Sequence, residues 1–396
     1  MPIKKNIIDF AFSSSHYKND RARQTHSLSN HFASLPGSAR EREKENKANT
    51  MRDKFKVGLT RDFLTEDGKL VFEDIGLGVL DEQPHIEYQF FKEHFPEIAP
   101  DQIRGLDGII VLAPRVTRNT LKGADRLVVI ARFGVGYESV DLEACTEANV
   151  ALFITPGAVE RPMAGGIIAF MLALSRKMLI KDKLIRAGRW KEKILHMGTE
   201  LVGRTLGSVG IGNIGSEMFR LAKPFGFARM IAYDPYVSRE KAEKLGVELV
   251  DLDTVLRESD FVTINCPLTK ETAKLIGERE FGLMKKTAYF INTARGGIVD
   301  QKALTRALVE GRIAGAGLDV FEQEPIDPED PLLKLENVIV TPHAIGWTNE
   351  CFRDIGRMDC LGILKASRGE VPDHVVNKAV LEKKEFLEKL AQYQRG

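Results

Sequence analysis

An arginine and a histidine each follow an apolar segment of this chain, and together they could bind a small anion and move a proton. Arg295 comes directly after residues 288–292, which we expect to form a buried strand, and His343 follows the apolar residues 338–341. A planar guanidinium binds a carboxylate through two parallel hydrogen bonds and can polarise an adjacent carbonyl group. Histidine is the usual proton donor near neutral pH. The bland alternatives are a solvated loop arginine and a structural histidine.

Carboxylates that could assist the histidine follow a third apolar segment, 314–319. Asp319 ends this segment, and Glu322 and Glu324 come shortly after it. A carboxylate beside a histidine favours the imidazolium form, which can donate a proton. Because ligands bind at the carboxyl ends of parallel strands, we expect these residues at the same sheet edge as Arg295 and His343. The residues alone leave open which glutamate pairs with the histidine.

A glycine motif indicates a dinucleotide site. Residues 210–215 read G-I-G-N-I-G between an apolar strand and an amphipathic helix, where glycines permit a tight turn and a close approach to a pyrophosphate. Asp234 follows at the end of the next expected strand, and a carboxylate there binds an adenosine ribose and repels a 2′-phosphate. We therefore predict NAD rather than NADP, with Arg239 as the nearby residue that could oppose this choice. The alternatives are a simple glycine-rich turn and a turn aspartate. The predicted nucleotide site comprises Gly210, Gly212, Asn213, Ile214, Gly215 and Asp234.

Two series of strands and helices position these groups. Short apolar strands are expected at 57–59, 108–112, 127–130 and 151–154, and a second series begins with a strand at 206–211 and a helix at 214–225. Strands buried on both faces and separated by helices predict parallel sheets. The predicted fold is α/β, with two doubly wound parallel-sheet domains: a Rossmann NAD-binding domain inserted into a flavodoxin-like substrate domain. The later strands are expected at 230–233, 261–266, 288–292, 314–319 and 338–341.

The domain boundaries follow from breaks in this pattern. Residues 155–157 read T-P-G and end the first series, and residues 371–377 are expected to return the chain to it. We predict a substrate domain of residues 51–154 and 348–396, and an inserted Rossmann NAD-binding domain of residues 155–347. A long helix over 162–188 is too apolar for a single exposed helix, so part of it should pack on another subunit.

Composition excludes several classes of function. The chain of 396 residues has a formal net charge of +1, so no global field recruits nucleic acid or a membrane surface. The four cysteines lack metal-site spacing, so we expect reduced thiols and no metal. No apolar run approaches the roughly 20 residues that span a bilayer. The polar first fifty residues should be disordered, Met51 could be an alternative start, and the expected location is cytoplasmic.

The ordered motifs resemble those of the D-isomer-specific 2-hydroxyacid dehydrogenase family over nearly all of residues 57–376. The resemblance is carried by G-V-G at 134–136, the glycine motif, C-P-L-T at 266–269, N-T-A-R-G-G at 292–297, L-D-V-F-E-Q-E-P at 318–325 and T-P-H at 341–343. It implies an NAD-dependent enzyme that interconverts a 2-keto acid and a D-2-hydroxy acid, and a homodimer built on the long helix.

The resemblance also assigns roles. It implies that Arg295 binds the substrate carboxylate and keto group, that His343 is the acid/base, and that Glu324 rather than Glu322 pairs with it. Asp319 should hold the nicotinamide carboxamide. Further cofactor-binding residues would be Cys266, Pro267, Thr293, Ala294 and His343, and the substrate carboxylate would bind at Phe133, Gly134, Val135 and Gly136.

Departures from related enzymes narrow the substrate. Glu324 separates the chain from formate dehydrogenases, which have glutamine there, and the apolar residues 111–113 replace basic residues of phosphoglycerate dehydrogenases, although Arg115, Arg132 and Arg161 could substitute. Gly165 and Gly166 replace a common Glu-His pair, with no consequence that the sequence reveals.

Two aromatic residues bear on the size of the substrate. Phe133 and Trp347 could narrow the pocket toward glyoxylate, hydroxypyruvate or pyruvate, or could be core aromatics. The identity of the 2-keto acid therefore stays open.

A different class of function shares this fold. NAD-binding transcriptional corepressors carry the same nucleotide site and catalytic residues. The residues after 376 predict one short charged helix instead of an extended partner-binding tail, which favours an enzyme.

Overall fold

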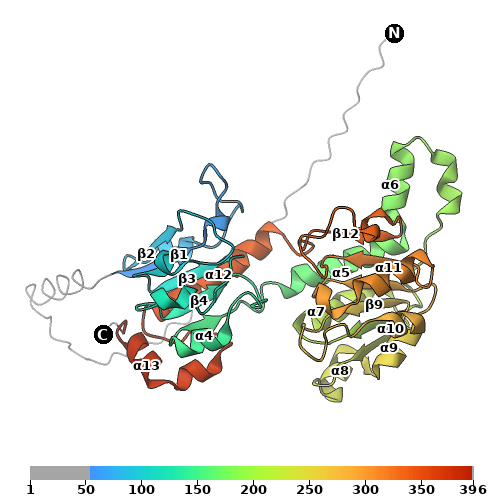
Figure 1. Cartoon of the computed structure of the whole chain (residues 1–396). Coiled ribbons are helices and arrows are strands. Elements are labelled where there is room, and N and C mark those ends of the chain that lie inside the picture. Colours follow the sequence, from blue (N-terminus) through green and yellow to red (C-terminus); the bar gives the residue numbers. More distant parts are fainter. Residues whose placement is uncertain (1–53, 395–396) are drawn as a thin grey trace, which may run out of the picture. The chain divides into compact units, whose positions relative to one another are not determined.

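The computed structural model describes residues 54–394, so the predicted disorder of the first fifty residues and the role of Met51 lie outside the described residues. Between 54 and 394 the chain forms two parallel sheets, of five and seven strands, with helices packed against them (Figure 1). No single described helix is long and apolar enough to cross a membrane. Two consecutive helices, α5 (Glu160–Ser175) and α6 (Met178–Arg186), are together long and apolar enough, but they are bent relative to each other.

The five-stranded sheet has the flavodoxin-like strand order β2-β1-β3-β4-β5, as predicted for this unit. The four predicted strands are confirmed, and β2 was missed. Its burial alternates along an edge strand, so it lacks the continuous apolar run by which the central strands were identified. The strands are β1 Phe55–Leu59, β2 Ile86–Phe90, β3 Gly108–Val111, β4 Val129–Arg132 and β5 Ala151–Phe153.

Several short helices connect these strands, and the end of the chain returns to the sheet. Ile363 of the returning helix α12 belongs to the same buried core as Val129 of β4. Val375 pairs with Phe153 at the end of β5, which brings residues 371–377 back to this sheet. The helices are η1 Arg61–Phe63, α2 Gly78–Asp81, α3 Pro100–Ile103, η2 Thr120–Gly123, α4 Leu142–Glu147, α12 Asn349–Ala366, η7 Lys378–Glu382 and α13 Lys384–Ala391.

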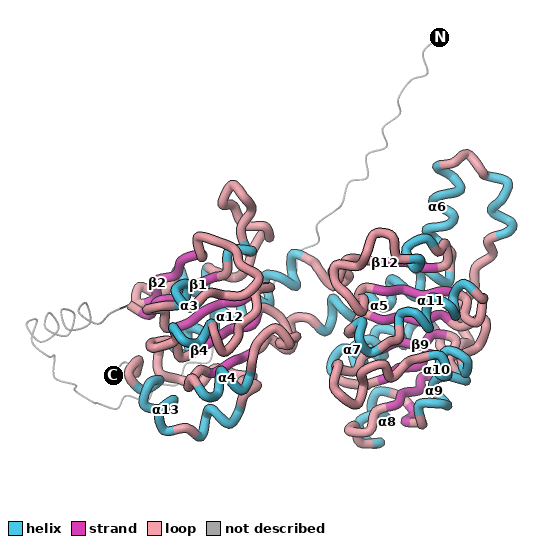
Figure 2. The backbone as a smooth tube through the Cα atoms, in the orientation of Figure 1, coloured by secondary structure: helices cyan, strands magenta, loops and turns pink. Residues whose placement is uncertain are grey.

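The seven-stranded sheet has the order β12-β11-β10-β9-β6-β7-β8, a doubly wound arrangement (Figure 2). All the predicted strands are present, and the two-residue edge strand β8 was missed. The strands are β6 Thr205–Val209, β7 Arg229–Tyr233, β8 Glu248–Leu249, β9 Phe261–Ile264, β10 Tyr289–Asn292, β11 Gly315–Leu318 and β12 Val338–Val340. The helices and 3₁₀ turns are α7 Asn213–Ala222, η4 Lys223–Phe225, α8 Arg239–Leu245, α9 Leu252–Glu258, α10 Glu278–Leu283, η5 Gly296–Ile298, α11 Gln301–Val309 and η6 Pro331–Lys334.

The prediction of one long helix over 162–188 is wrong, because this segment forms two helices. α5 spans Glu160–Ser175 and α6 spans Met178–Arg186, and Lys177 between them adopts a left-handed conformation with φ of 53°. No proline or glycine marks this break in the sequence. α5 is buried in the core of its own chain, whereas α6 and the following η3 (Trp190–Leu195) expose large apolar side chains.

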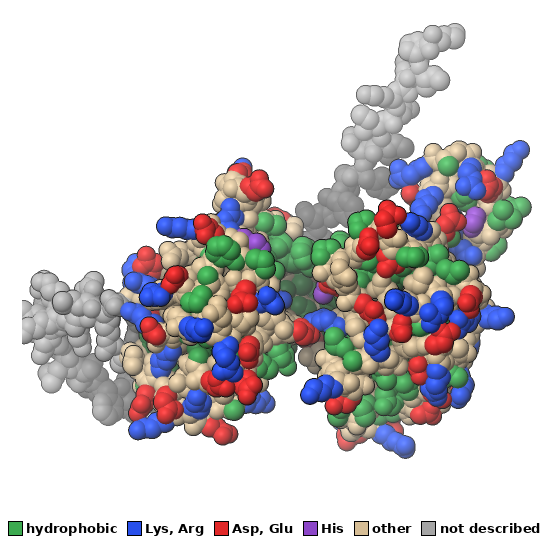
Figure 3. Space-filling model, in the orientation of Figure 1, with side chains coloured by type: hydrophobic (Ala, Val, Ile, Leu, Met, Phe, Trp, Pro, Cys, Tyr) green, Lys and Arg blue, Asp and Glu red, His purple; other side chains and the backbone are tan. Residues whose placement is uncertain are grey.

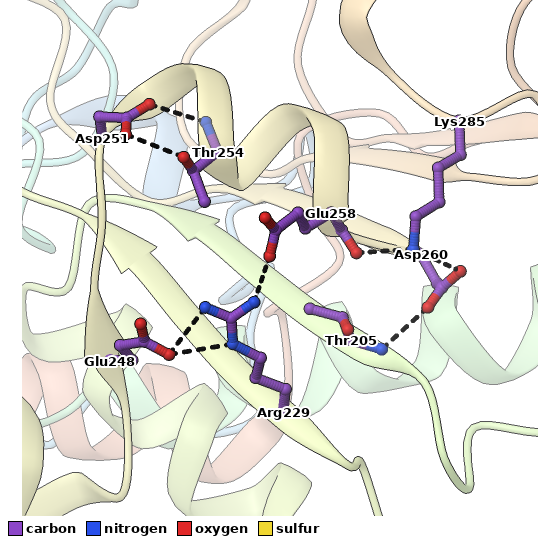
Figure 4. A network of polar contacts seen from close by, with 8 residues as sticks. All are labelled: Thr205, Arg229, Glu248, Asp251, Thr254, Glu258, Asp260 and Lys285. Carbon is purple, nitrogen blue, oxygen red and sulfur yellow. Dashed lines mark hydrogen bonds and ion pairs between the residues drawn. The ribbon is translucent and has the colours of Figure 1, made fainter.

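A polar network joins the starts of four strands, β6 to β9, at the edge of the seven-stranded sheet opposite the glycine motif (Figure 4). The carboxylate of Asp260 accepts hydrogen bonds from the backbone N–H of Thr205 at 2.9 Å and from Nζ of Lys285 at 3.2 Å. Arg229 at the start of β7 bonds both Glu248 and Glu258. These contacts stabilise the starts of the strands. The predicted site residues lie at the opposite, carboxyl ends of the strands.

The surface is chemically mixed. Acidic and basic side chains alternate over the visible face without a large region of one sign (Figure 3). Among the described residues, no group of three or more His, Cys, Asp or Glu side chains could hold a metal ion.

Candidate active site

Six of the predicted site positions lie within three residues after the ends of strands of the seven-stranded sheet. Because the strands are parallel, their carboxyl ends lie along one edge of the sheet, and the residues that follow them share that edge. These residues are Gly210 after β6, Asp234 after β7, Cys266 after β9, Arg295 after β10, Asp319 after β11 and His343 after β12.

The structure places Glu324, and not Glu322, beside the histidine. Nδ1 of His343 lies 2.7 Å from Oε2 of Glu324, whose other oxygen accepts a hydrogen bond from the backbone N–H of Phe321 at 3.0 Å. Burial acts to raise the pKa of Glu324, but the hydrogen bonds from His343 and Phe321 outweigh it and hold that pKa below its ordinary value. The glutamate is therefore an anion that orients the ring. Glu322 instead forms an ion pair with Lys274.

Asp319 fixes the turn that carries the histidine. Its side chain is buried, and Oδ1 accepts hydrogen bonds from Oγ1 of Thr341 at 2.5 Å and from the backbone N–H groups of Ala344 and Ile345 at 2.8 and 3.0 Å. Burial raises the pKa of Asp319, and these hydrogen bonds oppose the rise. His343 itself has a φ of 53°, which is uncommon for a residue other than glycine. The hydrogen bonds of Asp319 to Thr341, Ala344 and Ile345 hold the backbone on both sides of His343.

Arg295 lies on a loop held by Asn292, whose amide oxygen accepts from the N–H of Ala294 at 3.1 Å and whose Nδ2 donates to the carbonyl of Arg295 at 3.0 Å. The guanidinium donates two hydrogen bonds to the carboxylate of Glu138, from Nε to Oε1 at 2.9 Å and from Nη2 to Oε2 at 3.1 Å. A Cβ on Gly136 would lie 2.1 Å from Nη2. Only glycine lets the guanidinium rest there.

Sequence reasoning missed Glu138. It lies two residues beyond the predicted substrate loop, which was the available signal. Burial acts to raise the pKa of Glu138. The hydrogen bonds with Arg295 outweigh this effect, so the pKa of Glu138 is below its ordinary value. Glu138 therefore occupies two donors of the Arg295 guanidinium.

The loop of residues 133–136 is anchored at its first two residues. The N–H of Phe133 donates to the carbonyl of Val111 at 2.9 Å, and the carbonyl of Gly134 accepts from the N–H and Oγ1 of Thr155 at 3.0 and 3.1 Å. Gly134 has a φ of 117°, in a region that favours glycine. The loop thus has a fixed backbone at the end of β4, and Val135 lies within it.

The two aromatic residues singled out from the sequence differ in the structure. Phe133 is 5% exposed and packs edge-on against Phe63, as the core alternative requires. Trp347 is 57% exposed and contacts Phe72 and Phe352 by its edge, with ring centroids 5.8 and 4.9 Å apart. Trp347 is therefore exposed, and its interpretation as a core residue is wrong.

The glycine motif has the geometry that a dinucleotide requires. A Cβ on Gly210 would lie 2.7 Å from backbone atoms of Asn265 and Cys266, and one on Gly215 would lie 2.9 Å from the carbonyl of Gly210. A Cβ on Gly212, the residue before α7, would meet nothing within 4 Å. The turn is therefore tight on the protein side and open toward a pyrophosphate at the helix N-terminus.

Asp234 closes the other end of the nucleotide site. Its Oδ2 accepts a hydrogen bond from the N–H of Ile211 at 2.9 Å, and Oδ1 accepts from Tyr236 and Val237 at 2.9 and 3.2 Å. These bonds hold a carboxylate beside the glycine turn, as ribose binding by NAD requires. Asn213 donates from Nδ2 to Glu160 at 3.2 Å, and the oxygen of Pro267 accepts from Oγ1 of Thr272 at 2.6 Å.

The structure gives the Gly165-Gly166 pair a partial explanation. A Cβ on Gly166 would lie 2.7 Å from Cγ1 of Ile345, whereas one on Gly165 would meet nothing within 4 Å. Gly166 thus lets α5 pack against the turn that follows His343.

Comparisons with known proteins agree with this geometry. Residues 168–344 match the family model described as D-isomer specific 2-hydroxyacid dehydrogenase, NAD binding domain. The chain is 40% identical over 315 residues to a glyoxylate reductase of Korarchaeum cryptofilum, covering 78% of this chain and 94% of that protein. It is 39% identical over 322 residues to a D-3-phosphoglycerate dehydrogenase of Methanocaldococcus jannaschii, covering 81% of this chain and 59% of that one.

A solved structure is similar as well. The D-lactate dehydrogenase of Aquifex aeolicus, complexed with NAD and lactic acid, superposes with a TM-score of 0.70 at 26% identity and covers 81% of this chain and 99% of that one. The chain therefore belongs to the D-isomer specific 2-hydroxyacid dehydrogenase family. It is an NAD-dependent oxidoreductase that acts on 2-hydroxy acids.

Proposed function

We propose that this enzyme reduces a small 2-keto acid of the glyoxylate, hydroxypyruvate or pyruvate type to the D-2-hydroxy acid. The observation that carries the proposal is the His343–Glu324 pair, held at the same strand edge as Arg295 and the glycine motif. The similarity to a glyoxylate reductase along 94% of its length supports a substrate of this size.

In the proposed mechanism, bound NADH supplies the hydride to the 2-carbon of the keto acid. Arg295 binds the substrate carboxylate and polarises the keto oxygen, and its guanidinium stabilises the negative charge that develops there. His343 donates a proton to that oxygen, and Glu324 keeps Nδ1 of the ring engaged so that Nε2 is the nitrogen that faces substrate. In the reverse direction the same nitrogen accepts the proton.

Substrate entry must free Arg295 from Glu138. Because Glu138 binds two donors of the guanidinium, the substrate carboxylate replaces it in the bound state. The loop N–H groups of residues 133–136 then provide the remaining donors for the carboxylate.

We assign NAD binding to residues 155–347 and substrate binding to residues 51–154 and 348–396. The proposed cofactor contacts are Gly210, Gly212, Asn213, Ile214, Gly215, Asp234, Cys266, Pro267, Thr293, Ala294, Asp319 and His343. In this assignment Asp319 does two things: one oxygen holds the histidine turn, and the side chain receives the nicotinamide carboxamide.

We also propose a homodimer in the cytoplasm. Met178, Leu179 and Ile185 of α6, with Trp190 and Ile194 of η3, each expose a large apolar side chain, and exposed apolar surface is typical of protein interfaces. A second copy of the chain would cover it. The corepressor alternative has no observation in its favour.

The test is oxidation of NADH with glyoxylate, hydroxypyruvate, pyruvate and phosphohydroxypyruvate. We expect turnover with at least one of the first three and the weakest turnover with the phosphorylated acid, because residues 111–113 offer no cation. Tight NADH binding without turnover of any 2-keto acid would contradict the proposal. Preference for phosphohydroxypyruvate would contradict the assigned substrate class alone.

A further inference from the structure

Three polar side chains lie beneath the glycine turn of residues 210–215, and none of them is a proposed cofactor contact. Ser208 of β6 and Thr263 of β9 are 0% and 1% exposed, and they are paired in register in the sheet. Asn265 follows β9 directly, and its backbone N–H donates to the carbonyl of Val209 at 2.8 Å. The three side chains therefore occupy the sheet edge from which the turn starts.

Hydrogen bonds connect these side chains to the backbone of β6 and of the turn. Nδ2 of Asn265 donates to Oγ of Ser208 at 2.9 Å and to Oγ1 of Thr263 at 3.0 Å. Oγ of Ser208 donates to the carbonyl of Gly210 at 2.5 Å, and Oγ1 of Thr263 donates to the carbonyl of Gly207 at 3.1 Å. One amide group thus serves two hydroxyl groups, each of which holds a backbone carbonyl.

This network determines which way the amide of Asn265 points. A hydroxyl group has one proton, and each of these two donates it to a carbonyl, so each oxygen must accept from another donor. Sδ of Met218 lies 3.5 Å from Oγ1 of Thr263 but is a weaker acceptor than the carbonyl. Oδ1 of Asn265 is buried and has no hydrogen-bond partner among the described residues. Because an unpaired buried oxygen lowers stability, the two donors of Nδ2 are what this position requires.

The branch through Ser208 ends on the first peptide of the glycine turn. The carbonyl of Gly210 accepts from Ser208, and the N–H of the same peptide, which belongs to Ile211, donates to Oδ2 of Asp234 at 2.9 Å. Gly210 has a φ of 93°, and a Cβ there would lie 2.7 Å from the backbone of Asn265. The direction of this peptide therefore sets the start of the turn and the position of the carboxylate beside it.

The branch through Thr263 does not reach the turn. Gly207, whose carbonyl accepts from this hydroxyl, lies inside β6 and pairs in register with Val262 of β9 and Ile231 of β7. The two branches are alike in burial and in their bond to Asn265, but only one of them touches the nucleotide site.

We propose that Asn265 is a positioning residue for the cofactor: through Ser208 it fixes the peptide between Gly210 and Ile211, and with it the glycine turn and Asp234, in the arrangement that receives a pyrophosphate and a ribose. The inference rests on the proposed function, because it takes the glycine turn and its carboxylate as cofactor contacts. In this role Asn265 acts on the cofactor only through its neighbours.

The experiment compares Asn265→Ala, Ser208→Ala and the matched control Thr263→Val. The last two variants each remove one buried hydroxyl group that bonds the same amide, and only Ser208→Ala removes a contact with the turn. The measurements are the dissociation constant for NADH from a fluorescence titration, KM and kcat for the best 2-keto acid at saturating NADH, and Tm.

The expected result is a loss of cofactor affinity without a loss of chemistry. Asn265→Ala and Ser208→Ala should each raise the dissociation constant for NADH about three- to tenfold, as the loss of one buried hydrogen bond predicts. Thr263→Val should keep it within about twofold, although its Tm falls as in Ser208→Ala. KM for the 2-keto acid and kcat should stay within about twofold in all three.

A double variant tests whether the two residues act along one path. Asn265→Ala with Ser208→Ala should raise the dissociation constant no more than the worse single variant, because both changes release the same peptide. If Asn265→Ala does not fold, Asn265→Asp takes its place. Asn265→Asp keeps the shape of the side chain and removes its donors, so it should raise the dissociation constant at least as much.

The outcomes that overturn the inference differ from those that overturn the proposed function. An unchanged dissociation constant in the folded Asn265 and Ser208 variants, or an equal rise in Thr263→Val, would overturn this inference and leave the proposed function intact. A wild type that does not bind NADH would overturn both. A wild type that binds NADH but turns over no 2-keto acid would overturn the proposed substrate alone, and the dissociation constants would still decide the role of Asn265.

Discussion

The carboxyl edges of the two sheets are built in different ways. At the seven-stranded sheet, Arg295, Asp319 and His343 each lie within three residues of the end of their own strand, so a short stretch of chain places each group. At the five-stranded sheet, Arg132 ends β4, but the helix α12 that packs against this strand returns to the sheet only after the entire seven-stranded sheet has been formed. The first edge carries the proposed chemistry, and the second holds the proposed binding loop. The difference shows that strand ends specify catalytic groups locally, whereas their supports can come from distant parts of the chain.

The largest effect expected at the first edge follows Arg295→Ala. Loss of the guanidinium removes a donor at the developing negative charge, so kcat/KM should fall about 10²–10³-fold. NADH affinity should not change, because the glycine turn and Asp234 lie after other strands. Steady-state kinetics with glyoxylate and an NADH titration check both. Arg257→Ala, which removes an exposed arginine paired with Asp253, is the control. Retained activity in Arg295→Ala would remove Arg295 from catalysis.

A smaller effect is expected from Glu324→Gln. The pKa of Glu324 is below its ordinary value, with burial opposed by the hydrogen bond from His343, so this side chain is anionic through the working range. The neutral amide no longer favours the imidazolium, so the reduction should slow by about tenfold at neutral pH and its pH profile should shift toward acid. The pH dependence of kcat/KM measures this. The matched control is Glu322→Gln, and a profile that does not move in Glu324→Gln would detach Glu324 from His343.

The smallest effect concerns the support behind His343. Gly166→Ala should lower kcat a few-fold, because its Cβ meets Ile345 at 2.7 Å and must displace the turn whose N–H groups bind Asp319, at a cost of about 1–3 kcal/mol in stability. Gly165→Ala gains the same helix propensity but its Cβ meets nothing within 4 Å, so it should keep full activity and be the more stable variant. Tm and kcat for the two variants test this. Equal behaviour of the pair would show that the contact with Ile345 does not matter.

The same contrast explains what could be predicted from the sequence. Central strands such as β10 and β11 were found because they are continuous apolar runs, and the groups that follow them were found with them. The edge strands β2 and β8 were missed because their side chains are partly polar, and the break at Lys177 was missed because no glycine or proline marks it. The contact of Glu138 with Arg295 joins residues distant in sequence. Neither spacing nor periodicity could reveal that contact.

The central claim is that His343, held by Glu324, donates the proton at the edge that carries Arg295. Its most direct test is single-turnover oxidation of NADH with a saturating 2-keto acid, in the wild type and in His343→Ala, together with the chirality of the product formed from pyruvate. We expect both proteins to bind NADH equally, the wild type to form D-lactate, and the variant to be slower by about 10²-fold. Equal single-turnover rates in the two proteins, or an L product, would contradict the account.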